Sequence, residues 1–133
     1  MIEDPVAAEP RRGSEVVLVA EDEQLVRDLV VAALKQRGYV VVAVATGEAA
    51  LEEVDRLGPE LGILLTDVVM PGISGIELLE QARKVRPDLR AIFMSGYTAS
   101  AMDNHKALAG VTFMEKPFTL TRLDEVIRET LRT

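Results

Sequence analysis

The chain has 133 residues, and its 22 acidic and 15 basic side chains give a formal net charge of −7. That length suits one domain, and a composition of 48% hydrophobic and 28% charged residues is that of an ordinary globular protein. The sequence has no cysteine, which excludes disulfides and thiolate metal sites, and its one histidine, His105, excludes a multi-histidine metal site. The acidic balance argues against a general nucleic-acid or anionic-membrane surface.

Residues 1–14 are predicted to be a flexible tail that precedes one domain at 15–133. They contain Pro5, Pro10 and Gly13 with mixed charges, and they offer little apolar surface to bury. They also lack the apolar core of a signal peptide, and no stretch of the chain approaches the ~20 apolar residues of a membrane span. We therefore expect a cytoplasmic location and no direct contact with a membrane or with nucleic acid.

Short apolar runs alternate with segments of helical period through the rest of the chain. Thr46 is a candidate helix N-cap, and Ser74 followed by Glu77 is a capping-box pattern. Gly38 and Pro87 are typical of residues that follow helix ends. In chain order the predicted elements are a strand at 16–20, a helix at 24–37, a strand at 40–44, a helix from 46 to about 56, a strand at 62–66, a helix from 74 to before 87, a strand at 91–94, a helix at 99–109, a strand at 111–114 and a helix at 120–131.

This strict alternation predicts an α/β fold, with a five-stranded parallel sheet and helices on both of its faces. We expect the doubly wound (βα)5 arrangement, a three-layer sandwich with strand order 2-1-3-4-5. In the predicted helix at 24–37, the apolar positions are Leu25, Leu29, Ala32 and Ala33.

Polar residues follow four of the five predicted strands, at the end where such sheets bind ligands. Glu21 and Asp22 follow the first strand, Asp67 the third, Ser95 the fourth and Lys116 the fifth. Two carboxylates about 4 Å apart repel by about 4 kcal/mol at an effective dielectric of ~20, so a proton, a metal cation or Lys116 must compensate them, and a hard divalent ion fits best. Magnesium ions accept carboxylate oxygens together with a phosphate, and a hydroxyl and an ammonium group suit the remaining phosphoryl oxygens. Asp67, on a short connection, can act as a nucleophile on phosphorus and form an acyl phosphate.

These residues lie in segments that together resemble the receiver domain of two-component response regulators. The resemblance covers about residues 15–132 and implies the flavodoxin-like form of the doubly wound fold. The stretch at 95–98 resembles receiver modules fused to hybrid histidine kinases. The segments that carry the resemblance are 17–23, 64–75, 93–98 and 113–118.

The resemblance implies a role for each residue of the predicted site. Asp67 is implied to be the phosphoacceptor, Lys116 to contact the phosphoryl group, and Ser95 to be the switch hydroxyl. Phe113 occupies the position of an aromatic side chain coupled to that switch, and the bond from Lys116 to Pro117 is implied to be cis. The residues implied to hold Mg²⁺, for which Mn²⁺ substitutes, are Asp22, Asp67 and the backbone carbonyl of Val69 directly and Glu21 through a water molecule.

The implied function is to accept a phosphoryl group from a phosphohistidine on a histidine kinase or a phosphotransfer protein, and then to change protein contacts. The module is therefore not expected to be an enzyme acting on a separate substrate. The partner would meet Leu25 and Val26 and the loop near Pro117. A homodimer would use the face formed by the predicted elements at 99–109, 111–114 and 120–131.

Two other functions are compatible with this fold. An aspartyl-phosphate phosphatase of the haloacid-dehalogenase type needs a second Asp two residues after the nucleophile, where this chain has Val69, so its proton donor would be missing. An interaction module on the same fold would need no phosphorylation, and its binding would not depend on Asp67.

Overall fold

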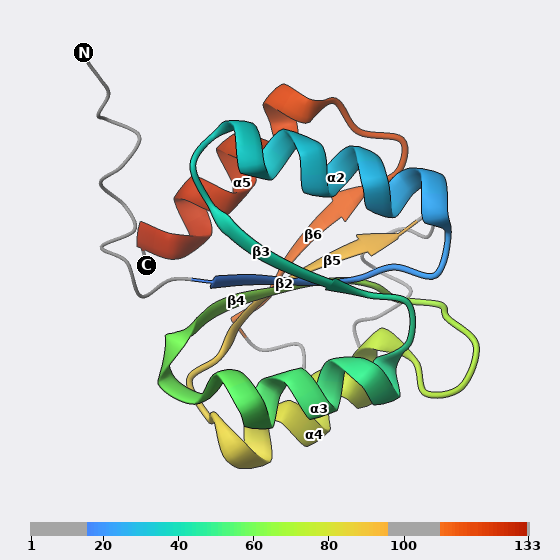
Figure 1. Cartoon of the computed structure of the whole chain (residues 1–133), viewed down its shortest axis with the longest axis vertical. Coiled ribbons are helices and arrows are strands. Elements are labelled where there is room, and N and C mark those ends of the chain that lie inside the picture. Colours follow the sequence, from blue (N-terminus) through green and yellow to red (C-terminus); the bar gives the residue numbers. More distant parts are fainter. Residues whose placement is uncertain (1–15, 96–109, 133) are drawn as a thin grey trace.

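The computed structural model describes residues 16–95 and 110–132, which form a parallel five-stranded sheet with helices on both faces (Figure 1). Across the sheet the strands lie in the order β3-β2-β4-β5-β6. This is the predicted order 2-1-3-4-5, so the fold prediction is confirmed. The strands are β2 (Val16–Ala20), β3 (Val40–Val44), β4 (Leu61–Asp67), β5 (Arg90–Ser95) and β6 (Thr112–Glu115).

The helices form the two outer layers (Figure 1). Helices α2 and α5 cover one face of the sheet, and helices α3 and α4 cover the other. The predicted tail at 1–14 and the predicted helix at 99–109, with His105 and part of the predicted dimer face, lie outside the described residues. The helices are α2 (Gln24–Gln36), α3 (Gly47–Leu57), α4 (Gly75–Val85) and α5 (Leu120–Arg132), and the 3-10 helix η2 (Gly58–Glu60) precedes β4.

The central strands are buried on both faces because helices cover the sheet on each side. Successive side chains point to opposite faces, so each strand contributes to two cores. Leu18, Leu64 and Phe93 pack toward α3 and α4, while Val19 and Leu65 pack toward α2 and α5. Among residues 16–95 and 110–132, no helix combines the length and apolar character that a membrane span requires.

The predicted helix caps are present in the structure. The Thr46 hydroxyl accepts a hydrogen bond from the Ala49 N–H at 3.0 Å, and the Ser74 hydroxyl accepts one from the Glu77 N–H at 3.1 Å. Gly38 has φ +91°, the left-handed conformation that favours glycine after a helix end. These interactions set where α3 and α4 begin and where α2 ends.

The buried stripe of α2 differs from the apolar positions that the sequence suggested. The helix buries Val30 and Leu34, whereas Leu25 and Leu29 are 79% and 61% exposed. Val30 follows Leu29 by one residue, which is about 100° around the helix. Helix α2 therefore presents two leucines to the solvent beside the carboxyl ends of the strands.

Candidate functional site

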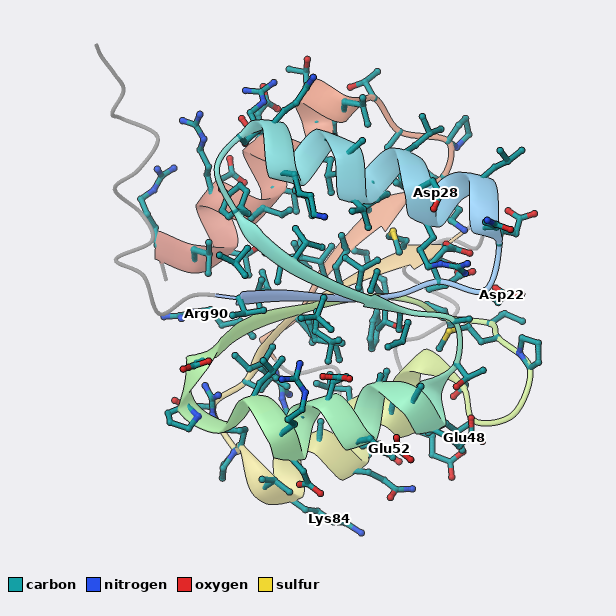
Figure 2. All side chains as sticks on the ribbon, viewed as in Figure 1. Asp22, Asp28, Glu48, Glu52, Lys84 and Arg90 are labelled. Atoms are coloured by element: carbon teal, nitrogen blue, oxygen red, sulfur yellow. The ribbon has the colours of Figure 1, made fainter. Side chains whose placement is uncertain are left out.

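Three carboxylates meet at the carboxyl end of the sheet. Glu21 and Asp22 directly follow β2, and Asp67 is the last residue of β4, the strand beside it. The direction in which successive strands are added across the sheet reverses between β2 and β4, and such a switch point leaves a crevice at the carboxyl ends of the two strands. One oxygen from each carboxylate lies within 4.8 Å of the others. Figure 2 shows Asp22 at this edge of the molecule.

Lys116 joins two of these carboxylates from the loop after β6. Its Nζ donates hydrogen bonds to Glu21 Oε1 at 3.1 Å and to Asp67 Oδ2 at 3.2 Å. The Lys116 N–H donates to the Ser95 carbonyl at 2.8 Å, which fixes the lysine backbone against the end of β5. The peptide bond from Lys116 to Pro117 is cis.

Glu21 is the most deeply placed of the three acids, with no exposed surface. Its carboxylate accepts a second hydrogen bond from the Glu23 N–H at 2.9 Å. Burial raises the pKa of Glu21, although the Glu23 N–H and Lys116 both act to lower it. A buried carboxylate needs such partners because an uncompensated charge is costly away from water.

The charges of the crevice remain unbalanced. Burial raises the pKa of Asp67, and Asp22 raises it further, while Lys116 acts to lower it. Burial alone would lower the pKa of Lys116, but Glu21 and Asp67 together raise it, so this lysine stays charged. Among the described residues, three carboxylates against one ammonium leave excess negative charge, and their oxygens are the ligands that a hard divalent cation prefers. The residues present therefore fit a magnesium ion.

The backbone around Asp67 is held from several sides. The Thr66 hydroxyl donates to the Asp67 carbonyl at 2.9 Å, and the Val68 N–H donates to the Met94 carbonyl at 3.1 Å. The Gly75 N–H donates to the Val68 carbonyl at 2.8 Å, so the first residue of α4 folds back against the end of β4. A Cβ atom on Gly75 would overlap the Asp67 carbonyl oxygen. This glycine lets the helix pass directly behind the site.

Gly75→Ala is therefore expected to destabilise the protein by about 1–3 kcal/mol, the usual cost of overpacking. A loss of stability would be informative, because replacing a glycine inside a helix by alanine ordinarily stabilises the protein by roughly 0.5–1 kcal/mol. Urea unfolding followed by circular dichroism measures the change. Ser74→Gly is the control, since it alters the same helix start at a cost of a few tenths of a kcal/mol. Equal or greater stability of Gly75→Ala would contradict the close approach to Asp67.

The other predicted site residues lie around this group. Ser95 is 2% exposed at the end of β5, and Val69 is 55% exposed in the loop after Asp67. Phe113 is half-buried on β6, and its ring meets that of Phe93 edge-on, with 5.6 Å between the ring centroids. The structure thus brings Glu21, Asp22, Asp67 and Lys116 together. Ser95 is joined to this group through its carbonyl, which accepts the hydrogen bond from the Lys116 N–H.

The sequence analysis missed Arg27, which acts on the site through Glu21. The Arg27 Nη1 donates to the Glu21 carbonyl at 2.8 Å and ties the start of α2 to the buried acid. A basic residue in the first turns of a helix opposes the helix dipole, and that unfavourable position is the signal that could have indicated a specific partner.

The comparison with protein families agrees with this geometry. Residues 17–128 match the family model described as the response regulator receiver domain. The chain belongs to this family. The matched range includes both acids after β2, Asp67 and Lys116. The protein is therefore a receiver domain, a phosphoacceptor module of two-component phosphorelay signalling.

Relatives of this receiver domain include both a kinase and solved receiver structures. It is 43% identical to the sensor kinase CckA of Brucella abortus over 136 residues, which cover 96% of this chain but 14% of the kinase. It is 35% identical to the crystallised receiver domain from the hybrid histidine kinase CckA, with a TM-score of 0.76 and coverage of 87% of this chain and 98% of that one. The response regulator TrrA of Thermotoga maritima, solved in complex with Mg²⁺ and BeF, is 27% identical with a TM-score of 0.76, again covering 87% and 98%.

Proposed function

We propose that this receiver domain accepts a phosphoryl group on Asp67 from a phosphohistidine, with Mg²⁺ bound beside it. The observation that most supports this is the meeting of three carboxylates with the Lys116 ammonium at one end of the sheet. The domain itself is proposed to span residues 15–133.

Asp67 is the carboxylate best placed to attack phosphorus. Glu21 has no exposed surface, so a donor cannot reach it, whereas the Asp67 side chain is 14% exposed. In the transfer, an Asp67 oxygen bonds to phosphorus, the bond from phosphorus to the donor breaks, and the donor leaves with that electron pair. Lys116, bonded to Asp67 in the unphosphorylated protein, would then neutralise charge on the phosphoryl oxygens.

Glu21, Asp22, Asp67 and the carbonyl of Val69 are proposed to hold the metal ion. Such an ion supplies positive charge that lets an anionic donor approach three carboxylates. Mn²⁺ prefers the same carboxylate and carbonyl oxygens and is proposed to substitute. The solved relative TrrA, with Mg²⁺ and BeF, supports this proposal by similarity.

Phosphorylation is proposed to act through the end of β5. A phosphoryl group adds charge and three strong acceptor oxygens, which would attract the Ser95 hydroxyl. Phe113 has no hydroxyl, so its coupling to Ser95 would be steric, through the space its ring occupies beside Phe93. A homodimer through β6, α5 and residues 99–109 is a proposed consequence of that change.

The proposed docking face for the histidine kinase or phosphotransfer protein lies next to Lys116. An apolar groove of about 430 Å³ opens there between α2 and the loop after β6. The exposed Leu29 of α2 lines this groove, and the exposed Leu25 lies outside it. An exposed apolar patch beside Asp67 and Lys116 indicates a surface for contact with a protein partner. The residues that line the groove are Val26, Leu29, Val30, Lys116, Pro117, Phe118 and Leu120.

The test is to incubate the protein with acetyl phosphate and Mg²⁺ and to measure its intact mass. We expect one adduct of about 80 Da, the mass of a phosphoryl group, that survives acid and is lost in base. Adding EDTA should prevent labelling, since the carboxylates then repel the donor. Absence of the adduct from the wild-type protein would refute the proposal.

We further propose that this chain is not a phosphatase for separate substrates. Val69 stands where the haloacid-dehalogenase mechanism needs an acid to protonate the leaving group, and valine carries no proton to donate. Multiple turnover on p-nitrophenyl phosphate would contradict this.

A further inference from the structure

We propose that Arg27 is a positioning residue of the magnesium site and holds the backbone from which Asp22 reaches the metal ion. The inference rests on the proposed function, because it concerns the same metal ion. It goes beyond that function by giving a role to a side chain outside the residues proposed to hold the ion. Arg27 is half-buried in the first turn of α2, directly after the loop that carries Asp22.

The Asp22 carboxylate is not held by contacts of its own. The residue is exposed, and no hydrogen bond from residues 16–95 and 110–132 reaches its side chain. One of its oxygens nevertheless lies within 4.8 Å of oxygens from Glu21 and Asp67, although like charges at such a distance repel. The position of the Asp22 carboxylate therefore depends on the backbone that carries it.

That backbone begins at Glu21, whose polar atoms all have partners. The Glu21 N–H donates to the Val44 carbonyl at 3.1 Å, and the Glu21 carbonyl accepts from Arg27 Nη1 at 2.8 Å. Its Oε1 accepts from Lys116 Nζ at 3.1 Å, and its Oε2 accepts from the Glu23 N–H at 2.9 Å. The bond from Arg27 is the shortest of the four, and it acts on the carbonyl that directly precedes Asp22.

The two peptide groups on either side of Asp22 are thus both fixed. A peptide group is planar, so the orientation of the Glu21 carbonyl sets the positions of the Asp22 nitrogen and α-carbon. The Glu23 N–H, bonded to the Glu21 carboxylate, fixes the peptide group that follows. Arg27 therefore sets, through the backbone, the direction in which the Asp22 side chain leaves the chain.

The sign of a change in Mg²⁺ affinity distinguishes positioning from a simple charge effect. The guanidinium group is positive, so an Arg27 that acted by charge alone would repel Mg²⁺, and its removal would tighten binding. If Arg27 positions Asp22, its removal leaves a carboxylate that the ion must order as it binds. That ordering costs free energy, so binding should weaken.

The first experiment titrates MgCl2 into the full chain without a phosphodonor and follows the backbone amide NMR signals of Asp22 and Asp67. Arg27→Met should raise the dissociation constant of Mg²⁺ about tenfold, the usual effect of removing a group that orients a metal ligand. Arg27→Lys, whose side chain ends short of the guanidinium Nη atoms, should raise it about threefold. An unchanged or lower constant in Arg27→Met would overturn the proposal. If that variant does not fold, the same result in Arg27→Lys would overturn it.

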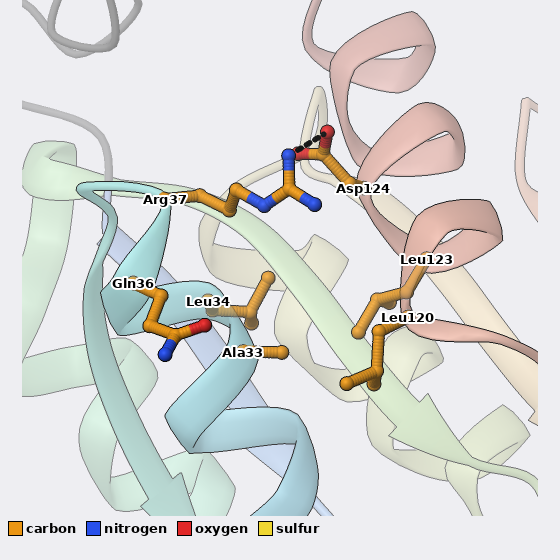
Figure 3. Close-up of a pocket in the computed structure, with 7 residues that line it drawn as sticks. All are labelled: Ala33, Leu34, Gln36, Arg37, Leu120, Leu123 and Asp124. Carbon is orange, nitrogen blue, oxygen red and sulfur yellow. Dashed lines mark hydrogen bonds and ion pairs between the residues drawn. The ribbon is translucent and has the colours of Figure 1, made fainter. Parts of the chain in front are cut away.

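Arg37→Met is the matched control on the same helix. Arg37 follows the last residue of α2, roughly 15 Å along the helix from Arg27, and its Nη1 donates to Asp124 Oδ2 at 3.1 Å (Figure 3). Both substitutions remove one positive charge and one hydrogen bond, so both should lower the stability of the metal-free protein to urea. Only Arg27→Met should weaken Mg²⁺ binding. An equal loss of affinity in Arg37→Met would show a general effect of destabilisation and would overturn the positioning role.

The second experiment measures labelling by acetyl phosphate at increasing Mg²⁺ concentration. In Arg27→Met the concentration of Mg²⁺ that gives half of the maximal rate should rise about tenfold. The maximal rate should fall by less than about threefold, because Asp67 and Lys116 still lie together at the saturated site. An unchanged half-saturating concentration would contradict the proposal.

The wild-type protein separates this inference from the proposed function. A wild type that binds no Mg²⁺ would refute both. A wild type that binds Mg²⁺ but is not labelled would refute the function, and the titration alone would still test Arg27. Normal binding and labelling of the wild type, with the same Mg²⁺ affinity in Arg27→Met, would refute the positioning role alone.

Discussion

Asp67→Asn is expected to reduce acetyl phosphate labelling to background, a loss on the order of 10³-fold or more, because it removes the accessible carboxylate that lies beside Lys116. Glu21 cannot replace it, since that carboxylate has no exposed surface. Asp22 is exposed but has no contact with Lys116 among the described residues, so a phosphoryl group there would lack the lysine. Intact-mass measurement over time gives the rate.

Folding of the Asp67→Asn variant should be preserved. Burial raises the pKa of Asp67, so ionisation of this carboxyl opposes folding at pH values above that pKa. The uncharged amide removes this cost, and the metal-free variant should unfold at a temperature equal to or above that of the wild type. Asp28→Asn, on an exposed acid of α2, is the matched control and should be labelled normally (Figure 2). Equal labelling of Asp67→Asn and the wild type would show that another residue is the acceptor.

Lys116→Met is expected to slow labelling by about 10²–10³-fold, the usual effect of removing one group that stabilises charge in a transition state. The side chain keeps its length and loses its ammonium group. The same substitution leaves the buried Glu21 without its cation, and breaking a buried ion pair in this way costs up to about 3–5 kcal/mol. Metal-free Lys116→Met should therefore also unfold at lower urea concentration.

Adding Mg²⁺ distinguishes the effect of Lys116→Met on stability from its effect on labelling. A bound divalent cation would compensate Glu21 and Asp67, so Mg²⁺ should restore much of the stability, but it cannot restore the lost contact to the phosphoryl oxygens. The control Lys84→Met, at an exposed lysine on α4, should change neither the labelling rate nor the stability to urea (Figure 2). Labelling of Lys116→Met within threefold of the wild-type rate would show that the lysine serves structure alone.

The sequence by itself determined the order of strands and helices and most of the site. Apolar runs and helical periods are local, and so are caps such as Thr46 and Ser74, whose side chains bond the backbone three residues away. Once the strands of a parallel sheet are ordered, their carboxyl ends share one edge, and residues such as Asp22, Asp67 and Lys116 must approach each other there.

Only the tertiary structure decided how the elements face one another. Periodicity could not tell whether α2 turns Leu29 or Val30 to the sheet, because the rotation of a helix about its axis is set by what it packs against. The complete burial of Glu21 was likewise invisible in a run of exposed acids. The contact between Arg37 and Asp124 joins residues 87 positions apart, and no local pattern predicts such a pair. Interactions of this kind exist only after distant segments have packed together, which is why they appear in the structure and not in the sequence.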